Sequence, residues 1–318
     1  MHRARLFPAA LLLLSMTAAA PRSDVDGRVA FGGLTHEYHL YIPSSYRAGR
    51  PTPLVILLHG GGGDADGIEE TTNLRATAER HGFLLLRPEG FDLRGRDLRT
   101  FNAGNCCGPA AARNVDHVGA IAAILDAVER DYSVDRRRVY ATGHSNGGMM
   151  AYRLAVELSD RIAAIAPNAS YLVLDHPRKP SRPVPVFHMH GLADRCAPFE
   201  GGRSAGFDPS IRPPVRASID FFVQANGCST APRVTYDHGD AHCVTYGGCR
   251  AKADVVLCTI AGGGHAWPGG ARYALRTQHN CGGSMTRDLD ANEAMWAFFV
   301  AHPMEGRGAA TTPRGSGR

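Results

Sequence analysis

Short apolar runs alternate along this chain with stretches in which apolar positions recur at helical spacing. Residues 53–58 (PLVILL) form a continuous apolar run that ends in a histidine and four glycines. Residues 84–87 form a second run, and helical spacing covers residues 73–81 between them. A continuous apolar run of this length is typical of a buried parallel strand, because both of its faces are covered. The order predicts a strand–helix–strand unit.

The same alternation continues to residue 302. Near the start, apolar and polar positions alternate over residues 28–31 and 35–42 around Gly32 and Gly33, which predicts a β-hairpin. Parallel strands need crossover helices, so the pattern predicts an α/β fold: a mostly parallel central sheet with helices on both faces. We expect further strands at 138–142, 162–167, 184–189, 243–248 and 254–260, and further helices at 115–132, 146–158, 217–225 and 291–302.

The two ends of the chain differ in composition from the rest. Residues 1–20 carry Arg3 and Arg5, then an apolar run over 6–16, then three alanines, which is the order of a secretory signal peptide. A membrane anchor is the alternative, but the run is shorter than the roughly 20 residues that span a bilayer. We therefore expect a secreted, extracellular or periplasmic protein with no membrane contact after signal removal.

Between these ends, residues 21–304 are expected to form a single α/β domain, and residues 305–318, rich in Gly, Arg, Thr and Pro, a disordered tail. Of the 318 residues, 44% are hydrophobic and 20% charged, which suits one sizeable globular core. The net charge of +5 comes from scattered arginines rather than a basic cluster, so no nucleic-acid partner is expected.

Eight cysteines in an exported chain predict disulfides, and the even number agrees with full pairing. The expected strands at 243–248 and 254–260 would place Cys243 opposite Cys258. A metal cluster is the competing interpretation, but the repeated short Cys or Cys/His pairs of zinc sites are missing. We expect no metal.

The segment Gly143–Gly147 (GHSNG) lies between the expected strand 138–142 and the expected helix 146–158. Gly-x-Ser-x-Gly at a strand-to-helix turn is typical of a nucleophile elbow, in which a strained serine is exposed and flanking glycines allow close approach of strand and helix. This context favours Ser145 as a catalytic nucleophile over a serine in an ordinary glycine-rich turn.

A serine nucleophile needs a histidine base and a carboxylate that orients it. Asp194 and His265 follow expected strands in the order Ser, Asp, His, at the sheet edge where open α/β sheets form their sites. Asp208 and Asp116 are rivals to Asp194. A zinc site at His188 and His190 is the other alternative for this edge, but no third ligand has supporting spacing.

Hydrolysis also requires donors for the oxyanion of the tetrahedral intermediate. The backbone amide of Asn146, directly after the serine, is one candidate, and Gly61 in the glycine run after His59 is the other. A phosphate-binding loop is the alternative for these glycines, but Asp64 stands where a Gly-Lys-Ser/Thr ending would be required.

Taken together, these motifs resemble the secreted polyhydroxybutyrate-depolymerase and feruloyl-esterase family of α/β-hydrolases. The resemblance implies an α/β-hydrolase fold, a Ser145–Asp194–His265 triad, no cofactor, and ester substrates that are hydroxyalkanoate oligomers or plant cell-wall phenolic esters. It is carried by PLVILLHGGGG (53–63), FNAGNCCG (101–108), NVDHVG (114–119), YATGHSNGGMM (140–150), HGLAD (190–194) and GGHAWPG (263–269).

The resemblance further implies that Phe101, Asn102 and Trp267 contact the substrate, together with the loop of Cys106 and Cys107. Core packing is the alternative for Phe101 and Trp267. Phe101 also departs from the tryptophan we would expect at its position, which leaves the choice of ester open.

Ester hydrolysis through an acyl-enzyme is therefore the leading hypothesis for function. A serine peptidase on the same fold is an alternative, because the same triad cleaves amides. A non-catalytic secreted binding scaffold is the alternative from another class. Few residues follow the last expected helix, so we expect soluble esters or oligomers rather than an insoluble polymer to be the substrates.

Overall fold

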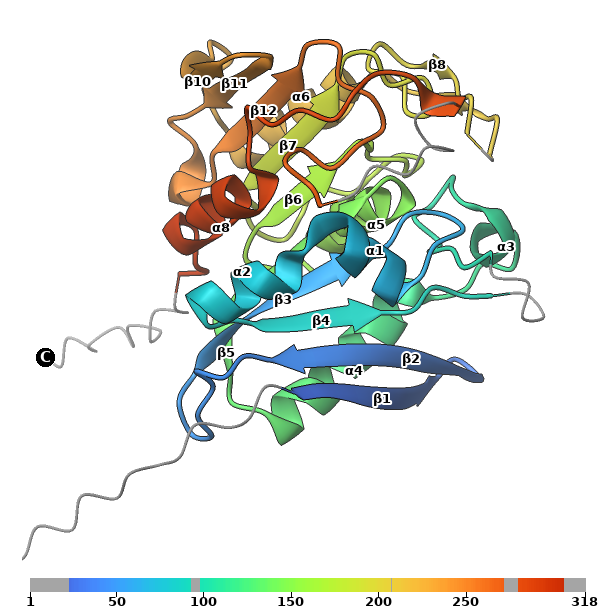
Figure 1. Ribbon diagram of the computed structural model, residues 1–318, viewed down its shortest axis with the longest axis vertical. Coiled ribbons are helices and arrows are strands. Elements are labelled where there is room, and N and C mark those ends of the chain that lie inside the picture. Colours follow the sequence, from blue (N-terminus) through green and yellow to red (C-terminus); the bar gives the residue numbers. More distant parts are fainter. Residues whose placement is uncertain (1–22, 93–97, 207, 272–279, 306–318) are drawn as a thin grey trace, which may run out of the picture.

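The computed structural model describes residues 23–92, 98–206, 208–271 and 280–305. The expected signal peptide and residues 306–318 of the expected tail lie outside these ranges. The described strands form a ten-stranded sheet in the order β1-β2-β4-β3-β5-β6-β7-β12-β11-β10 (Figure 1). They are β1 (Ser23–Phe31), β2 (Leu34–Ile42), β3 (Thr52–Leu58), β4 (Leu84–Pro88), β5 (Val134–His144), β6 (Ile165–Asn168), β7 (Val186–Gly191), β10 (Arg233–His238), β11 (Ala241–Tyr246) and β12 (Val255–Ile260).

The pairing within this sheet confirms the mostly parallel architecture. Neighbouring strands from β4 through β12 in the sheet order are all parallel. Antiparallel pairs extend both sides, with β1 and β2 beside β4, and β11 and β10 beside β12. A separate two-stranded piece, β8 (Gly202–Arg203) with β9 (Ile211–Arg212), lies outside the large sheet.

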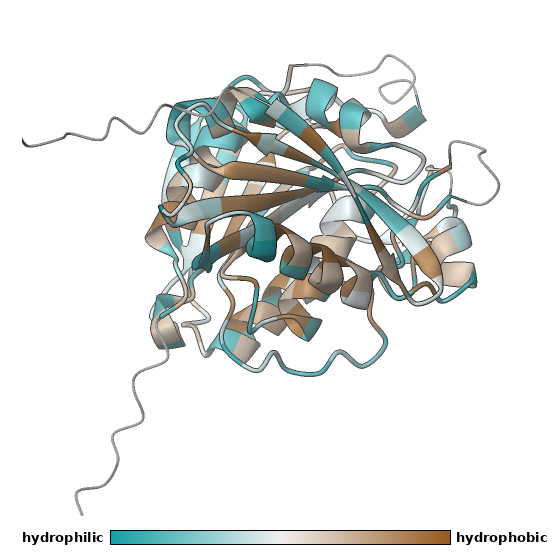
Figure 2. Cartoon of the chain, turned by 90° about the horizontal axis from the view of Figure 1, so that it is seen from below, coloured by the Kyte–Doolittle hydropathy of each residue, from teal (hydrophilic) through white to brown (hydrophobic). Residues whose placement is uncertain are grey.

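Successive strand residues point to opposite sides of the sheet, so the apolar strands present apolar side chains on both faces. Helices cover both faces. In β3, Leu54 and Ile56 belong to one apolar cluster, whereas Val55 and Leu57 belong to the other. Figure 2 shows the hydrophobic strands between the helices. The helices are α1 (Ala65–Thr72), α2 (Leu74–His81), α3 (Gly108–Ala112), α4 (His117–Asp131), α5 (Asn146–Glu157), α6 (Val215–Asn226) and α8 (Ala291–Ala301), with a 3₁₀ turn at Arg250–Lys252.

Several elements differ from the sequence-based expectation, among them α1, β10 and β11. The single expected helix at 73–81 is preceded by α1, whose N-terminus is capped by the Asp64 side chain accepting from the Gly67 amide, and Asn73 with φ 52° separates the two helices. At the far edge of the sheet, β10 is missing from the expectation, and β11 begins two residues before the expected strand at 243. The side chains of β10 are all exposed, so no buried apolar pattern marks the strand.

All eight cysteines are paired, and one predicted pair is confirmed. Cys243 and Cys258 face each other across β11 and β12 and form a disulfide. The other pairs are Cys106–Cys107, Cys196–Cys281 and Cys228–Cys249.

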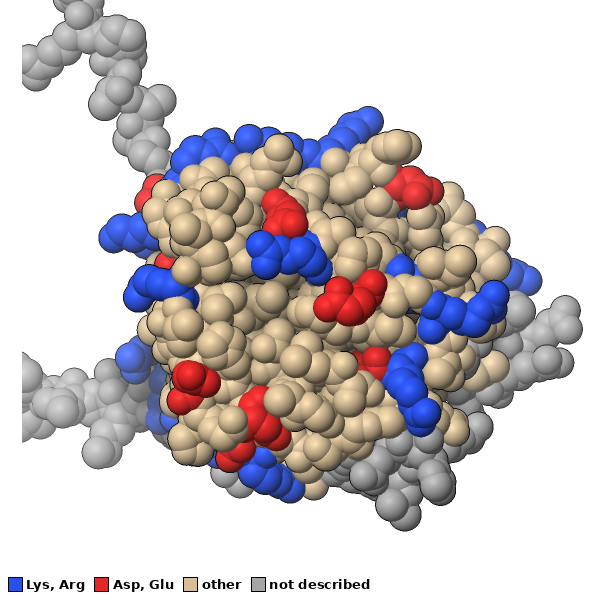
Figure 3. Space-filling model, turned by 90° about the horizontal axis from the view of Figure 1, so that it is seen from above, with Lys and Arg blue, Asp and Glu red and all other residues tan. Residues whose placement is uncertain are grey.

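Among the described residues, no helix has the length and apolar character needed to cross a bilayer. On the face in Figure 3, basic and acidic side chains are interspersed rather than gathered by sign.

The parallel strands bring the candidate chemistry to one edge. His59 follows β3, Ser145 follows β5, Asn168 ends β6, Asp194 lies in the turn after β7, and His265 lies in the loop after β12. Residues far apart in the chain thus meet where these strands end.

Candidate active site

Ser145 occupies a sharp turn between β5 and α5. Its backbone has φ 55° and ψ −120°, a conformation that costs energy for a residue with a side chain and is typical of functional turns. A Cβ on Gly143 would lie 2.6 Å from the carbonyl carbon of Gly147, and a Cβ on Gly147 would overlap the Leu58 carbonyl. The turn therefore requires glycine at both positions, as expected for a nucleophile elbow.

Asp194 and His265 lie beside this turn and form a direct hydrogen bond. His265 Nδ1 is 2.6 Å from Asp194 Oδ2, and both side chains are buried. The other carboxylate oxygen, Oδ1, accepts from the backbone amides of Cys196 at 2.8 Å and Ala197 at 2.7 Å. Burial by itself would raise the pKa of Asp194, but His265 and the Ala197 amide outweigh it and hold that pKa below its ordinary value.

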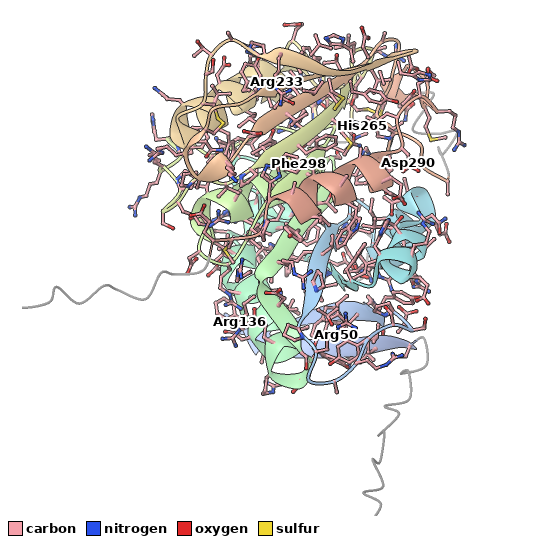
Figure 4. The ribbon with its side chains drawn as sticks, turned by 90° about the vertical axis from the view of Figure 1, so that its left-hand side faces the viewer. Arg50, Arg136, Arg233, His265, Asp290 and Phe298 are labelled. Carbon is pink, nitrogen blue, oxygen red and sulfur yellow. A yellow bond between two sulfur atoms is a disulfide. The ribbon has the colours of Figure 1, made fainter. Side chains whose placement is uncertain are left out.

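Ser145 and His265 line one cavity of about 440 Å³, a volume within the usual range for small-molecule sites. The glycine loop after β3 forms part of the wall, since Gly61 and Gly62 both line the cavity. A Cβ on Gly60 would lie 3.5 Å from the Ser145 Cβ, so this loop packs directly against the serine. Figure 4 shows His265 in the loop after β12, close to the start of α8 at Asp290.

Comparisons with known proteins identify the family. A family model described as esterase PHB depolymerase matches residues 36–178. The putative esterase NocK of Nocardia uniformis subsp. tsuyamanensis is 31% identical over 294 residues, which cover 83% of this chain and 81% of the relative. The chain belongs to the PHB depolymerase esterase family. It is accordingly a carboxylic ester hydrolase.

Two further comparisons add one relative by sequence and one solved structure by fold. Feruloyl esterase B of Piromyces equi is 30% identical over 230 residues, which cover 70% of this chain but only 41% of that longer protein. The solved acetyl xylan esterase of Aspergillus awamori superposes with a TM-score of 0.57 at 13% identity, covering 83% of this chain and 93% of that one. The shared architecture is the predicted α/β-hydrolase fold.

The three residues predicted to contact substrate are buried and do not line the cavity of this esterase. Phe101, Asn102 and Trp267 are 0%, 3% and 1% exposed, and none is among the described residues that line the cavity. Phe101 packs against the His59 ring, with ring centroids 4.6 Å apart. Trp267 Nε1 donates to Asn292 Oδ1 at 2.9 Å. These side chains fill space between elements, and their direct contact with substrate stays a prediction.

Asn102 and Asn146 show how the buried residues hold the loop instead. Asn102 Nδ2 donates to the Val115 carbonyl at 3.0 Å. The Asn146 side chain accepts from the Phe101 amide at 2.7 Å and donates to the Phe101 carbonyl at 2.9 Å. The loop that carries Cys107 is thereby fixed to the elbow, and Cys107 itself lines the cavity as the resemblance implied.

The rival carboxylates have other partners in the esterase. Asp116 caps α4, since its Oδ1 accepts from the Gly119 amide at 2.8 Å. Asp208 pairs with Arg212 at 3.0 Å and lies on the cavity wall. Among the described candidates, Asp194 is the carboxylate bonded to His265.

His188 and His190 form a buried hydrogen-bonded chain rather than an open metal site. His190 Nε2 donates to the Ala197 carbonyl at 2.7 Å, so its Nδ1 accepts from His188 Nε2 at 3.0 Å. His188 Nδ1 then accepts from the Tyr152 hydroxyl at 2.8 Å. Burial lowers the pKa of both histidines, which favours these neutral forms. All four ring nitrogens are occupied, and the chain ends at the carbonyl of Ala197, the residue whose amide donates to Asp194.

A metal site elsewhere in the described residues also lacks suitable donors. The one cluster of potential ligands there is Cys106, Cys107 and Asp208. The two cysteines are joined as a disulfide and offer no thiolate.

His59 has a structural role, since its Nδ1 donates to the Gly60 carbonyl at 2.8 Å and its Nε2 accepts from the Gly90 amide at 2.9 Å.

Asn168 is a site residue that the motif analysis did not identify. Its side-chain Nδ2 lies 2.9 Å from the Ala266 carbonyl and 2.8 Å from His144 Nδ1. Its backbone carbonyl accepts from the Ser145 amide at 3.0 Å. It therefore ties the serine turn to the His265 loop. Its position at the carboxyl end of β6 was the signal that could have revealed it.

Replacing Asn168 with alanine should reduce kcat by roughly fivefold to tenfold with a smaller change in KM, because its side-chain bonds to the Ala266 carbonyl in the His265 loop and to His144 Nδ1 beside Ser145 are lost. Steady-state kinetics on p-nitrophenyl butyrate measure this. Asn105→Ala, at an exposed asparagine, is the control. A rise in KM with kcat unchanged would contradict a role in positioning His265.

Proposed function

We propose that this esterase works through an acyl-enzyme on Ser145, with His265 as the proton carrier and Asp194 as its orienting carboxylate. The observation that carries the proposal is the 2.6 Å contact between His265 Nδ1 and Asp194 Oδ2 at a cavity that Ser145 also lines. A carboxylate on Nδ1 keeps the proton there and leaves Nε2 able to accept the serine proton.

In the first half-reaction, Ser145 Oγ attacks the ester carbonyl while His265 Nε2 takes its proton. The imidazolium formed is stabilised by the Asp194 charge, and it then protonates the leaving alcohol. In the second half-reaction, water attacks the acyl-serine and His265 again removes and returns a proton. Each half thus begins and ends with a neutral histidine.

The oxyanion in both halves needs fixed donors, and we assign these to the backbone amides of Asn146 and Gly61. Among the glycines that follow His59, the Gly62 amide already donates to the Arg99 carbonyl at 2.8 Å and the Gly63 amide to the Gly60 carbonyl at 3.1 Å. Gly61 is therefore the better candidate. Removal of such a donor costs roughly 2.7 to 4 kcal/mol of transition-state stabilisation.

For substrates, we propose hydroxyalkanoate oligomers or plant cell-wall phenolic esters, acted on outside the cytoplasm. The names of the family and of feruloyl esterase B support these two classes. Four disulfides support an oxidising compartment. No cofactor enters the proposed reaction.

Purified protein assayed against p-nitrophenyl butyrate, methyl ferulate, acetylated xylan and poly(3-hydroxybutyrate) tests the proposal. We expect turnover of the p-nitrophenyl ester and of at least one natural-type ester, no comparable cleavage of peptide p-nitroanilides, and labelling of Ser145 by a fluorophosphonate probe located by mass spectrometry. Hydrolysis accompanied by labelling at a different residue would overturn the mechanism while leaving the esterase activity intact.

A further inference from the structure

Arg212 and Asp208 form a charged pair on the wall of the active-site cavity. Both line the cavity together with Ser145 and His265, and the guanidinium Nη2 is 3.0 Å from Asp208 Oδ2. The Arg212 side chain is only 5% exposed and that of Asp208 is 25% exposed. The pair therefore lies largely out of bulk water while facing the space that a substrate would occupy.

Among the described residues that line the cavity, His265 is the only other side chain able to carry a charge. Apart from His265, the other described residues on the wall are glycines and small, polar or apolar side chains, among them Leu98, Met149 and the Cys196–Cys281 disulfide. Removing an ion pair from water is costly unless its remaining hydrogen-bonding capacity is used. Within the cavity, a polar group of the substrate can use that capacity.

The segment that carries the pair is fixed to the turn of Asp194. Ser204 Oγ donates to the Cys196 carbonyl at 2.6 Å, and the Ala205 amide donates to the Arg195 carbonyl at 2.9 Å. The Cys196–Cys281 disulfide ties the same turn to residue 281. The charged pair thus has a set position relative to the histidine bonded to Asp194.

We propose that Arg212 and Asp208 bind a neutral hydroxyl group of the ester substrate, with the guanidinium donating a hydrogen bond to the hydroxyl oxygen and the carboxylate accepting a hydrogen bond from the hydroxyl. This inference rests on the proposed function, because it assigns specificity to the same cavity. A hydroxyl suits a paired donor and acceptor that carry no net charge together. A carboxylate would meet the charge of Asp208, and an apolar group would strip the pair of its remaining water.

The hydroxyl can come from two sources: the phenol of an aryl acyl group or the terminal hydroxyl of a hydroxyalkanoate oligomer. The first arm of the test compares methyl 4-hydroxycinnamate with methyl 4-methoxycinnamate. The second compares the methyl ester of a 3-hydroxybutyrate dimer with its O-methylated form. In at least one arm, we expect the free hydroxyl to raise kcat/KM by about 10- to 100-fold, the size of one hydrogen bond to charged groups.

The variants are Arg212→Gln, Arg212→Lys and Asp208→Asn, each assayed on both members of a pair. We expect Arg212→Gln and Asp208→Asn to reduce the hydroxyl-to-methoxy ratio to within about threefold of unity, and Arg212→Lys to retain part of it, since lysine keeps the charge but not the planar fork. The ratio is taken within each variant, so a loss of folded protein cancels. Arg203→Gln is the matched control, because exposed Arg203 bonds to the Pro209 carbonyl in the same β8–β9 segment.

The outcomes separate this inference from the proposed function. If the wild-type protein hydrolyses p-nitrophenyl butyrate but shows no hydroxyl preference in either arm, the inference fails and the mechanism stands. If the preference survives in all three variants, or falls equally in Arg203→Gln, the pair only secures the β8–β9 segment. A preference for methyl 4-carboxycinnamate that Arg212→Gln removes would replace the hydroxyl site with an anion site. Absence of turnover on every ester would overturn the proposed function itself.

Discussion

Replacing Ser145 with alanine is expected to reduce kcat by about 10⁵- to 10⁶-fold, because the attacking oxygen is removed and only binding and the oxyanion donors remain. Steady-state hydrolysis of p-nitrophenyl butyrate measures the loss relative to the wild-type enzyme. Burst-phase release of p-nitrophenol from concentrated wild-type enzyme gives the rate of acyl-enzyme formation with which the variant is compared. The left-handed turn at φ 55° accommodates alanine no worse than serine, so the variant should remain folded.

The matched control is Ser204→Ala, at another serine that lines the cavity. It loses the bond from Oγ to the Cys196 carbonyl and the bond that Oγ accepts from the Gly206 amide, so its kcat should fall by no more than roughly tenfold. The double variant Ser145→Ala/His265→Ala should be no slower than Ser145→Ala alone, because the two groups act as a unit. If Ser145→Ala keeps more than about a hundredth of the activity, another residue performs the attack.

The fold could be predicted largely because its central strands are continuous apolar runs. Residues 54–58 and 84–86 are buried on both faces, so their sequence carries the signal of a parallel sheet. The same reasoning misses β10, since an edge strand with exposed side chains needs no apolar pattern. It also misses α1, which depends on the Asp64 cap and on polar residues rather than on a broad apolar face.

The candidate catalytic residues could be predicted from motifs, whereas the residues of the cavity wall could not. Ser145 is set by a local turn whose glycines are read directly in the sequence. The wall formed by Leu98, Met149, Arg212 and Cys281 comes from four separated segments, and no local pattern marks any of them as neighbours of the serine. Residues implied by resemblance alone, such as Phe101, are close to the site but face the core.

Asp194→Asn tests the orienting role of the carboxylate more selectively than alanine would. Oδ1 of Asp194 accepts from two backbone amides, so the asparagine oxygen must take that position to keep both bonds. The asparagine NH₂ then faces His265 Nδ1, which can only accept from it. The histidine proton is forced onto Nε2, the atom that must accept from Ser145, and kcat is expected to fall by about 10⁴-fold, as when a triad carboxylate becomes an amide.

Asp116→Asn is the matched control for this exchange, because asparagine caps the start of α4 nearly as well as aspartate and kcat should stay within roughly twofold. Near-neutral pH kinetics on p-nitrophenyl butyrate compare the two variants, and urea unfolding shows whether both remain folded. Fluorophosphonate labelling of Ser145 should slow with kcat in Asp194→Asn, since both reactions need the same proton acceptor. Fast labelling with slow turnover would instead place the role of Asp194 in deacylation alone.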